Sequence, residues 1–523
     1  MKTILITSVL SFFCFAFVYS QQKPKVEISK PYPVIDANSK IYLRTNENII
    51  ALKDNFIQRF DISGLKFNKV AEYSLPKNGA KEQVVNIGDK FYLFYSLWDK
   101  EAKNEQLFFK EVSPDEGKMS NEGKLLFKVK GKITGMYAGS IFNASVINKF
   151  DFQFSYKSSK LLIKYRIKPE EKNDDLNYDI IGLNVYNSDL TKVWGKEVKM
   201  PYTEKKMDNL DYSVDGEGNV YILTRIYNDN STKLVDKDDK PNFHLEILKV
   251  EANSGNITKT PIKLEDKFVS QLSIYECNPE YMICTGFTNK GKDFGDADGL
   301  VVFKIEKDGT LSEKSFYKIP LEVLNLYVNE RTQKKNEKKD ENDKAEFQDL
   351  DLTNLIVQDD GSIIIIGEQF FIVTVRTKNG TYYIYNYCDI LFTKINKDGS
   401  LAYMKKLPKR QKGKAGQGGM SFKYMAGEGC HYLLFLDNVK NMNLPLNQRP
   451  ELHADGHGGY LTAYKIQDSD GKTEKVSILD LTNIKGIEGF QFSVDRIIPI
   501  SLNSFVFETY KKQKEDMLVK VTF

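Results

Sequence analysis

Apolar and polar positions follow a recurring pattern along the chain. The stretch "LFTKINKDGSLAYMKKL", from Leu391 to Leu407, has two extended runs on either side of an Asp-Gly pair. The stretch "VFKIEKDGTLSEKSFYKI", from Val302 to Ile319, has the same arrangement earlier in the chain. An Asp-Gly pair between extended runs favours a tight hairpin turn, because glycine adopts a positive φ without steric cost. Each stretch therefore predicts two antiparallel strands.

A second hairpin precedes each of these. The stretches "YSVDGEGNVYILTR" and "LIVQDDGSIIIIG" both show a moderately polar strand, a short turn and a strongly apolar strand. Two hairpins in series form a unit of four antiparallel strands, which we denote A to D. The pattern predicts a tail of only three strands at residues 490–523, preceded by units at 34–75, 82–128, 150–200, 208–264, 268–319, 350–408 and 420–480.

Serial four-stranded units resemble the blades of a β-propeller, which pack face to face around a central channel. The resemblance is architectural, because the sequence has no Trp-Asp signature, kelch double glycine or Asp-box. It implies an all-β fold of about eight blades, or seven if the compressed first unit is not a blade. The segment from Lys25 to Ile35 is expected to supply the outer strand that the last unit lacks, which closes the ring and covers its edges. Two stacked β-sandwiches are the alternative, but they do not explain the serial order of hairpins.

The N-terminus is typical of an export signal. Lys2 precedes an apolar run from Ile4 to Val18, and small Ser20 follows. We predict cleavage after Ser20, which leaves residues 21–523 as a single propeller domain with a charged insertion near 328–349 and a long loop near 437–459. A membrane anchor needs roughly 20 apolar residues, and this run is shorter. The signal resembles those of exported Gram-negative bacterial proteins and implies a location in the periplasm, at the cell surface or outside the cell.

Net charge, hydropathy and cysteine content indicate which partners and which covalent links to expect. The net charge is +4 over 523 residues, so no general attraction to nucleic acid is expected. No segment after the signal is apolar enough to span a membrane. Cys277 and Cys284 flank the turn "NPEY", where they either form a disulfide or remain buried thiols.

Loop lengths predict which face of the ring binds a partner. In a ring of four-stranded meanders, the A–B and C–D turns emerge on one face, and the B–C and D–A connections emerge on the other. Long connections fall in the second class, at 228–242, 288–299, 328–349, 409–419 and 437–459. Binding residues often lie on loops held by a rigid scaffold, so long loops gathered on one face favour a binding surface on that face. We call this face the long-loop face and the opposite one the short-turn face.

Several polar groups are candidates for binding. A basic run could attract an anionic glycan or envelope polymer, and it comprises Lys405, Lys406, Lys409, Arg410, Lys412 and Lys414. Polar residues of the A strands are expected to line the channel, which is either a ligand site or a solvated shaft. These residues are Gln153, Asp211, Gln271, Asn354 and Gln491.

Two loops carry candidate metal ligands, although the sequence requires no cofactor. "HADGHGG" places His453, Asp455 and His457 at alternate positions, as a zinc site could use them, but no fourth ligand is evident. "GDADG" offers Asp296 and Asp298 to calcium without the rest of a calcium-binding loop.

The sequence lacks the common catalytic motifs. It has no Gly-x-Ser-x-Gly elbow, no phosphate-binding glycine loop and no His-Glu-x-x-His, and only four histidines. We therefore predict an exported, non-catalytic binding or scaffold protein that engages an envelope protein or a glycan through the long-loop face. The alternative is a carbohydrate-active enzyme, a glycoside hydrolase or lyase, that uses loop or channel carboxylates.

Overall fold

The computed structural model describes residues 23–88, 90–138, 145–169, 176–264, 267–291, 293–378, 380–414, 419–455, 458–511 and 514–523. The predicted signal peptide, residues 1–20, lies outside the described residues. Within the described ranges, no helix is both long enough and apolar enough to cross a membrane.

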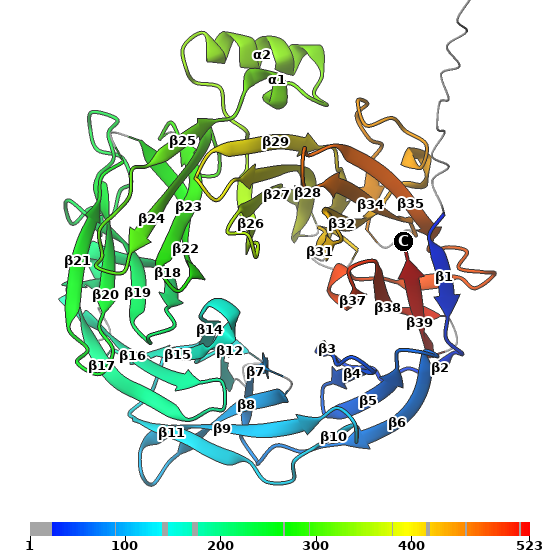
Figure 1. The fold of residues 1–523 in the computed structure, drawn as a ribbon, viewed down its shortest axis with the longest axis horizontal. Coiled ribbons are helices and arrows are strands. Elements are labelled where there is room, and N and C mark those ends of the chain that lie inside the picture. The colour runs from blue at the N-terminus through cyan, green and yellow to red at the C-terminus, as the bar shows by residue number, and fades with distance from the viewer. Residues whose placement is uncertain are drawn as a thin grey trace, which may run out of the picture.

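Eight sheets stand in a ring around a central axis, which confirms the predicted β-propeller and the count of eight blades (Figure 1). Strand A of each blade lies nearest the axis, and strand D lies at the rim. Blade 1 comprises β3 (Lys40–Arg44), β4 (Asn48–Lys53), β5 (Phe56–Asp61) and β6 (Lys66–Glu72). Blade 2 comprises β7 (Ala80–Ile87), β8 (Lys90–Asp99) and β9 (Asn104–Ser113), with β10 (Lys118–Met119) and β11 (Lys124–Lys130) both paired to β9.

The next blades follow the same meander. A small sheet of β12 (Met136–Ala138) and β13 (Ser145–Ile147) precedes blade 3. Blade 3 comprises β14 (Asp151–Phe154), β15 (Lys160–Arg166), β16 (Tyr178–Asn187) and β17 (Lys192–Thr203). Blade 4 comprises β18 (Met207–Val214), β19 (Val220–Tyr227), β20 (Phe243–Val250) and β21 (Ile257–Ile262). Blade 5 comprises β22 (Phe268–Asn278), β23 (Tyr281–Asn289), β24 (Gly299–Glu306) and β25 (Ser315–Lys318).

Blades 6 and 7 carry the additions that later form the candidate site. The predicted charged insertion near 328–349 contains α2 (Glu330–Asp340), and a short helix, α1 (Leu321–Leu324), precedes it between blades 5 and 6. Blade 6 comprises β26 (Leu350–Val357), β27 (Ile363–Thr377), β28 (Gly380–Ile395) and β29 (Leu401–Leu407), extended by β30 (Gln411–Gly413) and β33 (His453–Ala454). Blade 7 comprises β31 (Lys423–Gly427), β32 (Cys430–Asp437), β34 (Tyr460–Gln467) and β35 (Thr473–Asp480).

Blade 8 is built from both ends of the chain. The C-terminal segment gives β36 (Gly489–Gln491), β37 (Ile497–Ser501), β38 (Ser504–Lys511) and β39 (Glu515–Thr522). The N-terminal strand β1 (Lys25–Ile28) pairs antiparallel with β39, and β2 (Tyr32–Pro33) pairs with the same strand. The predicted closure by an N-terminal strand is therefore confirmed.

Each of the eight junctions between neighbouring blades contains one cluster of buried apolar side chains. Between blades 6 and 7, for example, Ile364 and Phe392 pack with Leu433 and Phe435. Each such fully buried side chain contributes roughly 1.5–3 kcal/mol relative to exposure. The apolar B strands and the C strands that pair with them therefore supply much of the packing between blades.

A buried polar network joins the first and last blades. The ammonium of Lys53 lies 2.7 Å from a carboxylate oxygen of Glu508 and 3.1 Å from one of Asp516, and all three side chains are fully buried. The phenols of Tyr32 and Tyr42 each donate a hydrogen bond to Glu508. Burial alone would raise the pKa of Glu508, but Lys53 and these phenols lower it by more, so this carboxyl stays ionised.

Cys277 and Cys284 are buried free thiols, so no disulfide joins them. Cys284 lies opposite Ile274 across the hairpin. Burial raises the pKa of Cys277 to about 12, which keeps this thiol protonated and unreactive.

The Asp-Gly turns give a first prediction. Gly309 and Gly399 have φ values of 88° and 89°, and an added Cβ would meet no atom nearer than 3.5 Å at Gly309 and 3.9 Å at Gly399. Gly399→Ala is therefore expected to cost about 1 kcal/mol of folding free energy through backbone strain alone. Denaturant unfolding measures this cost. Gly64→Ala is a control, because Gly64 has no positive φ and no atom within 4 Å of an added Cβ, and an equal loss there would contradict the explanation.

Candidate functional site

The long-loop face carries a polar cavity of about 520 Å³ between blades 5, 6 and 7. Its lining comes from B–C and D–A connections and from the middle of β27 and β28, where these two strands continue past the rest of the blade 6 sheet. The lining residues are Tyr327, Val328, Asn329, Thr332, Gln348, Asp349, Gln369, Phe371, Asn386, Cys388, Asp389, Lys409, Arg410, Lys412, Arg449, Pro450 and Leu452. We call this cavity the long-loop pocket.

Local structure holds the pocket walls in place. Asn329 caps the start of α2, because its side chain accepts a hydrogen bond from the backbone N–H of Thr332. Strand β30 pairs with β28 on one side and with β33 on the other, so the 411–413 and 453–454 segments form part of the blade 6 sheet. The main chain of the pocket is therefore tied into regular structure.

Three cations of the pocket have no carboxylate partner among the residues that the structure describes. They are Arg410, which is half-buried, and Lys412 and Arg449, which are exposed. Asp349 also lines the pocket without a cationic partner in the described chain, and burial followed by the nearby Asp296 carboxylate raises its pKa. Positive charge therefore exceeds negative charge around the opening.

Two lysines of the predicted basic run are not surface charges. Lys409 is fully buried and lies 2.7 Å from Glu368, and it also donates to the side chain of Gln411. Lys406 is buried, and its ammonium lies 3.4 Å from Asp389. Burial lowers the pKa of Lys406, and Asp389 partly offsets this effect. The expectation that both attract an external anion does not fit this placement, because internal carboxylates already neutralise them.

Lys406 instead anchors the helical insertion. Its ammonium donates to the backbone carbonyls of Leu324 and Leu326, at the end of α1 and just beyond it. Of the remaining members of the run, Lys405 lies on β29 outside the pocket lining, and Lys414 lies with its ammonium 5.3 Å from the ring centre of Tyr382. Lys406 and Lys409 of the basic run therefore form internal contacts, whereas Lys412 and Lys414 are exposed.

Several predicted channel residues link neighbouring blades. A carboxylate oxygen of Asp211 on β18 accepts a hydrogen bond from the backbone of Ile274 on β22. The amide of Gln271 on β22 donates to Asp351 on β26. Gln153 and Asn354 lie half-buried on β14 and β26, and Gln491 lies on β36. Asp211 and Gln271 therefore hold inner strands together.

The candidate metal ligands do not form a common site, because several of them already contact other protein groups. Asp298 accepts a hydrogen bond from Thr288 and lies 2.9 Å from the ammonium of Lys290, and Asp296 accepts one from the backbone of Asp349. Asp455 accepts a bond from the backbone of Gly419. His453 is buried on β33, and His457 lies outside the described residues. Among described residues, no group of three or more His, Cys, Asp or Glu side chains is placed to hold a metal ion.

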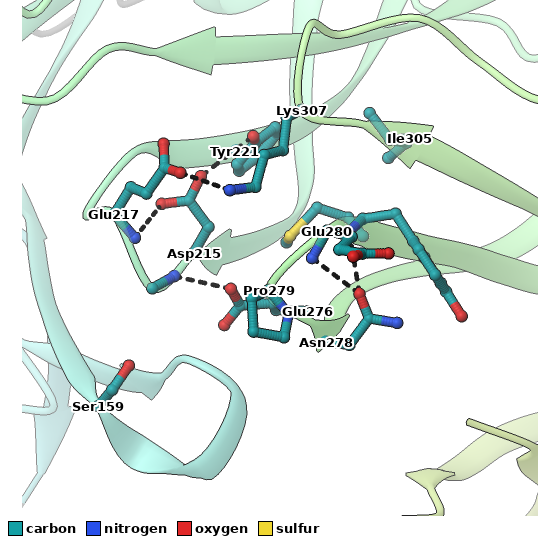
Figure 2. Close-up of a pocket in the computed structure, with 13 residues that line it drawn as sticks. Ser159, Asp215, Glu217, Tyr221, Glu276, Asn278, Pro279, Glu280, Ile305 and Lys307 are labelled. Atoms are coloured by element: carbon teal, nitrogen blue, oxygen red, sulfur yellow. Dashed lines mark hydrogen bonds and ion pairs between the residues drawn. The ribbon is translucent and has the colours of Figure 1, made fainter. Parts of the chain in front are cut away.

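A second cavity, of about 310 Å³, lies on the short-turn face between blades 4 and 5 (Figure 2). Its carboxylates are largely occupied by internal contacts. Glu276 accepts hydrogen bonds from the backbone of Tyr156 and Gly216, Asp215 accepts one from Tyr221, and Glu217 pairs with Lys307 at 2.6 Å. These contacts stabilise turns and connect blades, so this cavity offers less unpaired charge than the long-loop pocket.

Sequence reasoning missed two parts of the site. Arg449 is an isolated cation in a long loop, and only the fold brings it to Arg410 and Lys412. The outer halves of β27 and β28 were also not expected. The stretch "VTVRTKNGTYYIY" alternates around an Asn-Gly pair, which is itself a strong hairpin signal.

Comparison with known proteins adds no functional assignment. No protein family matches the chain, and no curated protein has a similar sequence. Among solved structures, the WD40 domain of SCAP from fission yeast aligns over 96% of this chain and 98% of its own, with 8% identity and a TM-score of 0.34. The β-propeller domain of the trilobed protease from Pyrococcus furiosus aligns over 85% and 97%, with 9% identity and a TM-score of 0.33. A protein of unknown function from Dyadobacter fermentans aligns over 95% and 99%, with 9% identity and a TM-score of 0.32.

Proposed function

We propose that this protein is an exported, non-catalytic binding protein of the cell envelope that binds an acidic glycan in the long-loop pocket. The observation that carries the proposal is the set of three cations, Arg410, Lys412 and Arg449, that line one polar cavity and have no carboxylate partner within the described ranges. Cations left without internal partners at a cavity are available to an external anion, and clefts lined by one sign of charge concentrate ligands of the opposite sign.

The chemistry of the lining suits a sugar acid. A guanidinium can hold a carboxylate through two parallel N–H donors, and Arg410 and Arg449 supply two such groups. The side-chain NH2 groups of Asn386 and Gln369 donate to backbone carbonyls, and their amide oxygens can accept hydrogen bonds from hydroxyl groups. Phe371 adds an aromatic surface against which an apolar sugar face can pack.

Catalysis is less well supported in this pocket. Glycoside hydrolysis usually needs two carboxyl groups, one on each side of the bond to be cleaved. The two pocket carboxyls are Asp349 and Asp389, and burial is the first cause of the raised pKa of each. Asp389 is nevertheless engaged with Lys406 and with the backbone N–H of Lys409. Asp349 alone remains as a candidate acid, so binding is the better-supported function.

Charge reversal in the pocket tests the proposal. Lys412→Glu and Arg449→Glu are each expected to weaken binding of polygalacturonate at least tenfold, because a charge-assisted hydrogen bond contributes about 1.5–3 kcal/mol and tenfold equals about 1.4 kcal/mol. Isothermal titration calorimetry measures the affinity, and thermal unfolding should change little because both side chains are exposed. Higher salt should weaken binding by the wild-type protein.

Lys472→Glu is the matched control, because Lys472 is an exposed lysine in a C–D turn on the short-turn face. Its affinity should equal that of the wild type. Glycan binding that is unchanged in both pocket variants but lost in Lys472→Glu would place the glycan site on the short-turn face instead. Release of shortened polygalacturonate during the titration would instead support the enzyme alternative.

A further inference from the structure

Strands β27 and β28 continue well past the sheet of blade 6 as a two-stranded arm. The register runs without interruption from Phe370 opposite Tyr387 to Thr377 opposite Gly380. On the other side of β27, pairing with β26 ends at Gln369. From Ile372 to Arg376, no strand in the described parts of the chain pairs with the outer edge of β27. We call this five-residue segment the free edge.

The arm exposes apolar side chains on both of its faces. Ile372 and Tyr383 are 47% and 51% exposed on one face, and Val373 and Tyr382 are 42% and 38% exposed on the other. Facing pairs such as Ile372–Tyr385 and Val373–Ile384 make the surface continuous across both strands. A long apolar edge is a template for pairing with another chain, and proteins usually cover such edges or break them with charge, proline or a bulge. Between Ile372 and Thr377 the register is unbroken, and Arg376 near the turn is the one charged residue.

The positive charge of the arm indicates what kind of partner can bind to it. From Gln369 to Cys388 the sequence contains no acidic residue, and it contains two basic ones, Arg376 and Lys378. Lys414 adds a third cation beside the arm, against the ring of Tyr382. A second copy of the arm would bring like charges together, which is unfavourable. The complementary surface is therefore acidic.

We propose that the free edge binds an extended, acidic segment of another protein, which joins the sheet as an additional antiparallel or parallel strand. Main-chain N–H and C=O groups that point away from β28 would pair with the incoming segment, as in other cases of strand addition. Its apolar side chains would cover Val373 on one face, and its carboxylates would lie beside Arg376 and Lys378 on the face that carries Ile372. At about 3.3 Å per residue, the free edge spans roughly 16 Å, enough for one short strand.

This inference goes beyond the glycan pocket and does not depend on it. The free edge is on β27, whereas Arg410, Lys412 and Arg449 surround the cavity beside the base of the arm. Loss of glycan binding in pocket variants would leave the free edge intact. Failure of one proposal is therefore distinguishable from failure of the other.

The test uses a synthetic eight-residue peptide of alternating valine and glutamate with the full chain. A counterpart peptide carries N-methyl groups on alternate amides, which blocks strand pairing but keeps the charge. We expect the first peptide to bind and to slow amide hydrogen exchange at residues 372–376, and we expect the second to bind at least tenfold more weakly. The double variant Arg376→Glu, Lys378→Glu should weaken the first peptide at least tenfold, and Ile372→Asp should do the same without changing thermal unfolding.

Several results would overturn the inference. Equal binding of the two peptides would show that charge alone is recognised. Polygalacturonate binding that is lost in the double variant would make the arm a glycan surface. A concentration-dependent dimer in sedimentation that disappears in Ile372→Asp would make a second copy of the chain the occupant. The Lys472→Glu variant again serves as a control and should bind the first peptide as the wild type does.

Discussion

Lys53→Met is expected to lower the free energy of unfolding by about 3–5 kcal/mol, because it leaves two buried carboxyl groups without their cation. Glu508 and Asp516 are both fully buried, and Lys53 is the ammonium that contacts each of them. Burial and the neighbouring Glu508 already raise the pKa of Asp516 despite Lys53. Without the ammonium, at least one carboxyl must take up a proton or the junction between blades 8 and 1 must open.

Denaturant unfolding of the whole chain measures this effect, and two further variants provide a control and a partial rescue. Lys25→Met removes an exposed partner of Glu27 and should change stability by less than about 0.5 kcal/mol. The triple variant Lys53→Met, Glu508→Gln, Asp516→Asn should recover part of the loss, since it removes the buried charges altogether. An unchanged unfolding midpoint for Lys53→Met alone would contradict the role assigned to this network.

Removal of residues 25–33 is expected to open the ring and to cost more than about 5 kcal/mol. This change removes β1 from the edge of β39 and takes away Tyr32, whose ring packs against Phe60 and Phe67 and whose hydroxyl bonds to Glu508. Loss of a large buried aromatic side chain alone costs about 3–5 kcal/mol. It also leaves β39 as an exposed edge strand, which favours aggregation.

A chain that begins at Lys23 is the control, and it should unfold as the wild type does. Limited proteolysis provides the readout for the shortened chain, which is expected to be cut first in blades 8 and 1. Adding a peptide of residues 23–35 should restore protection if strand closure is the cause. Equal stability of the two chains would show that the ring does not depend on its N-terminal strand.

The blades were predictable because their signals are local. Alternating strands and Asp-Gly turns specify each hairpin within a short stretch, and the unit expected at 350–408 corresponds to β26 through β29. The last predicted unit lacked a fourth strand, which indicated that the N-terminal segment completes this blade. Strand β1 does pair with β39. The arm also has a local signal, the Asn-Gly pair after Lys378, which the predicted four-stranded unit at 350–408 did not take into account.

The site was only partly predictable, because burial and ion pairing depend on distant residues. The basic run identified Arg410 and Lys412, but nothing near Lys409 in the sequence shows that Glu368 from strand β27 will neutralise it. Arg449 lies in a different loop and joins the pocket only through the packing of blades 6 and 7. Similarly, Gln271 was expected among the residues that line the channel, but the sequence does not show that its amide donates to Asp351 of the next blade.

Hydrogen–deuterium exchange with and without polygalacturonate tests most directly which face of the ring binds ligand. We expect slower exchange in the presence of the glycan at residues 327–332, 409–412 and 449–452, which contribute to the lining of the long-loop pocket. We expect no change at residues 215–217 and 276–282 of the short-turn cavity. Protection confined to those short-turn segments, or no protection at any segment of the long-loop pocket when binding is saturated, would contradict glycan binding in the long-loop pocket.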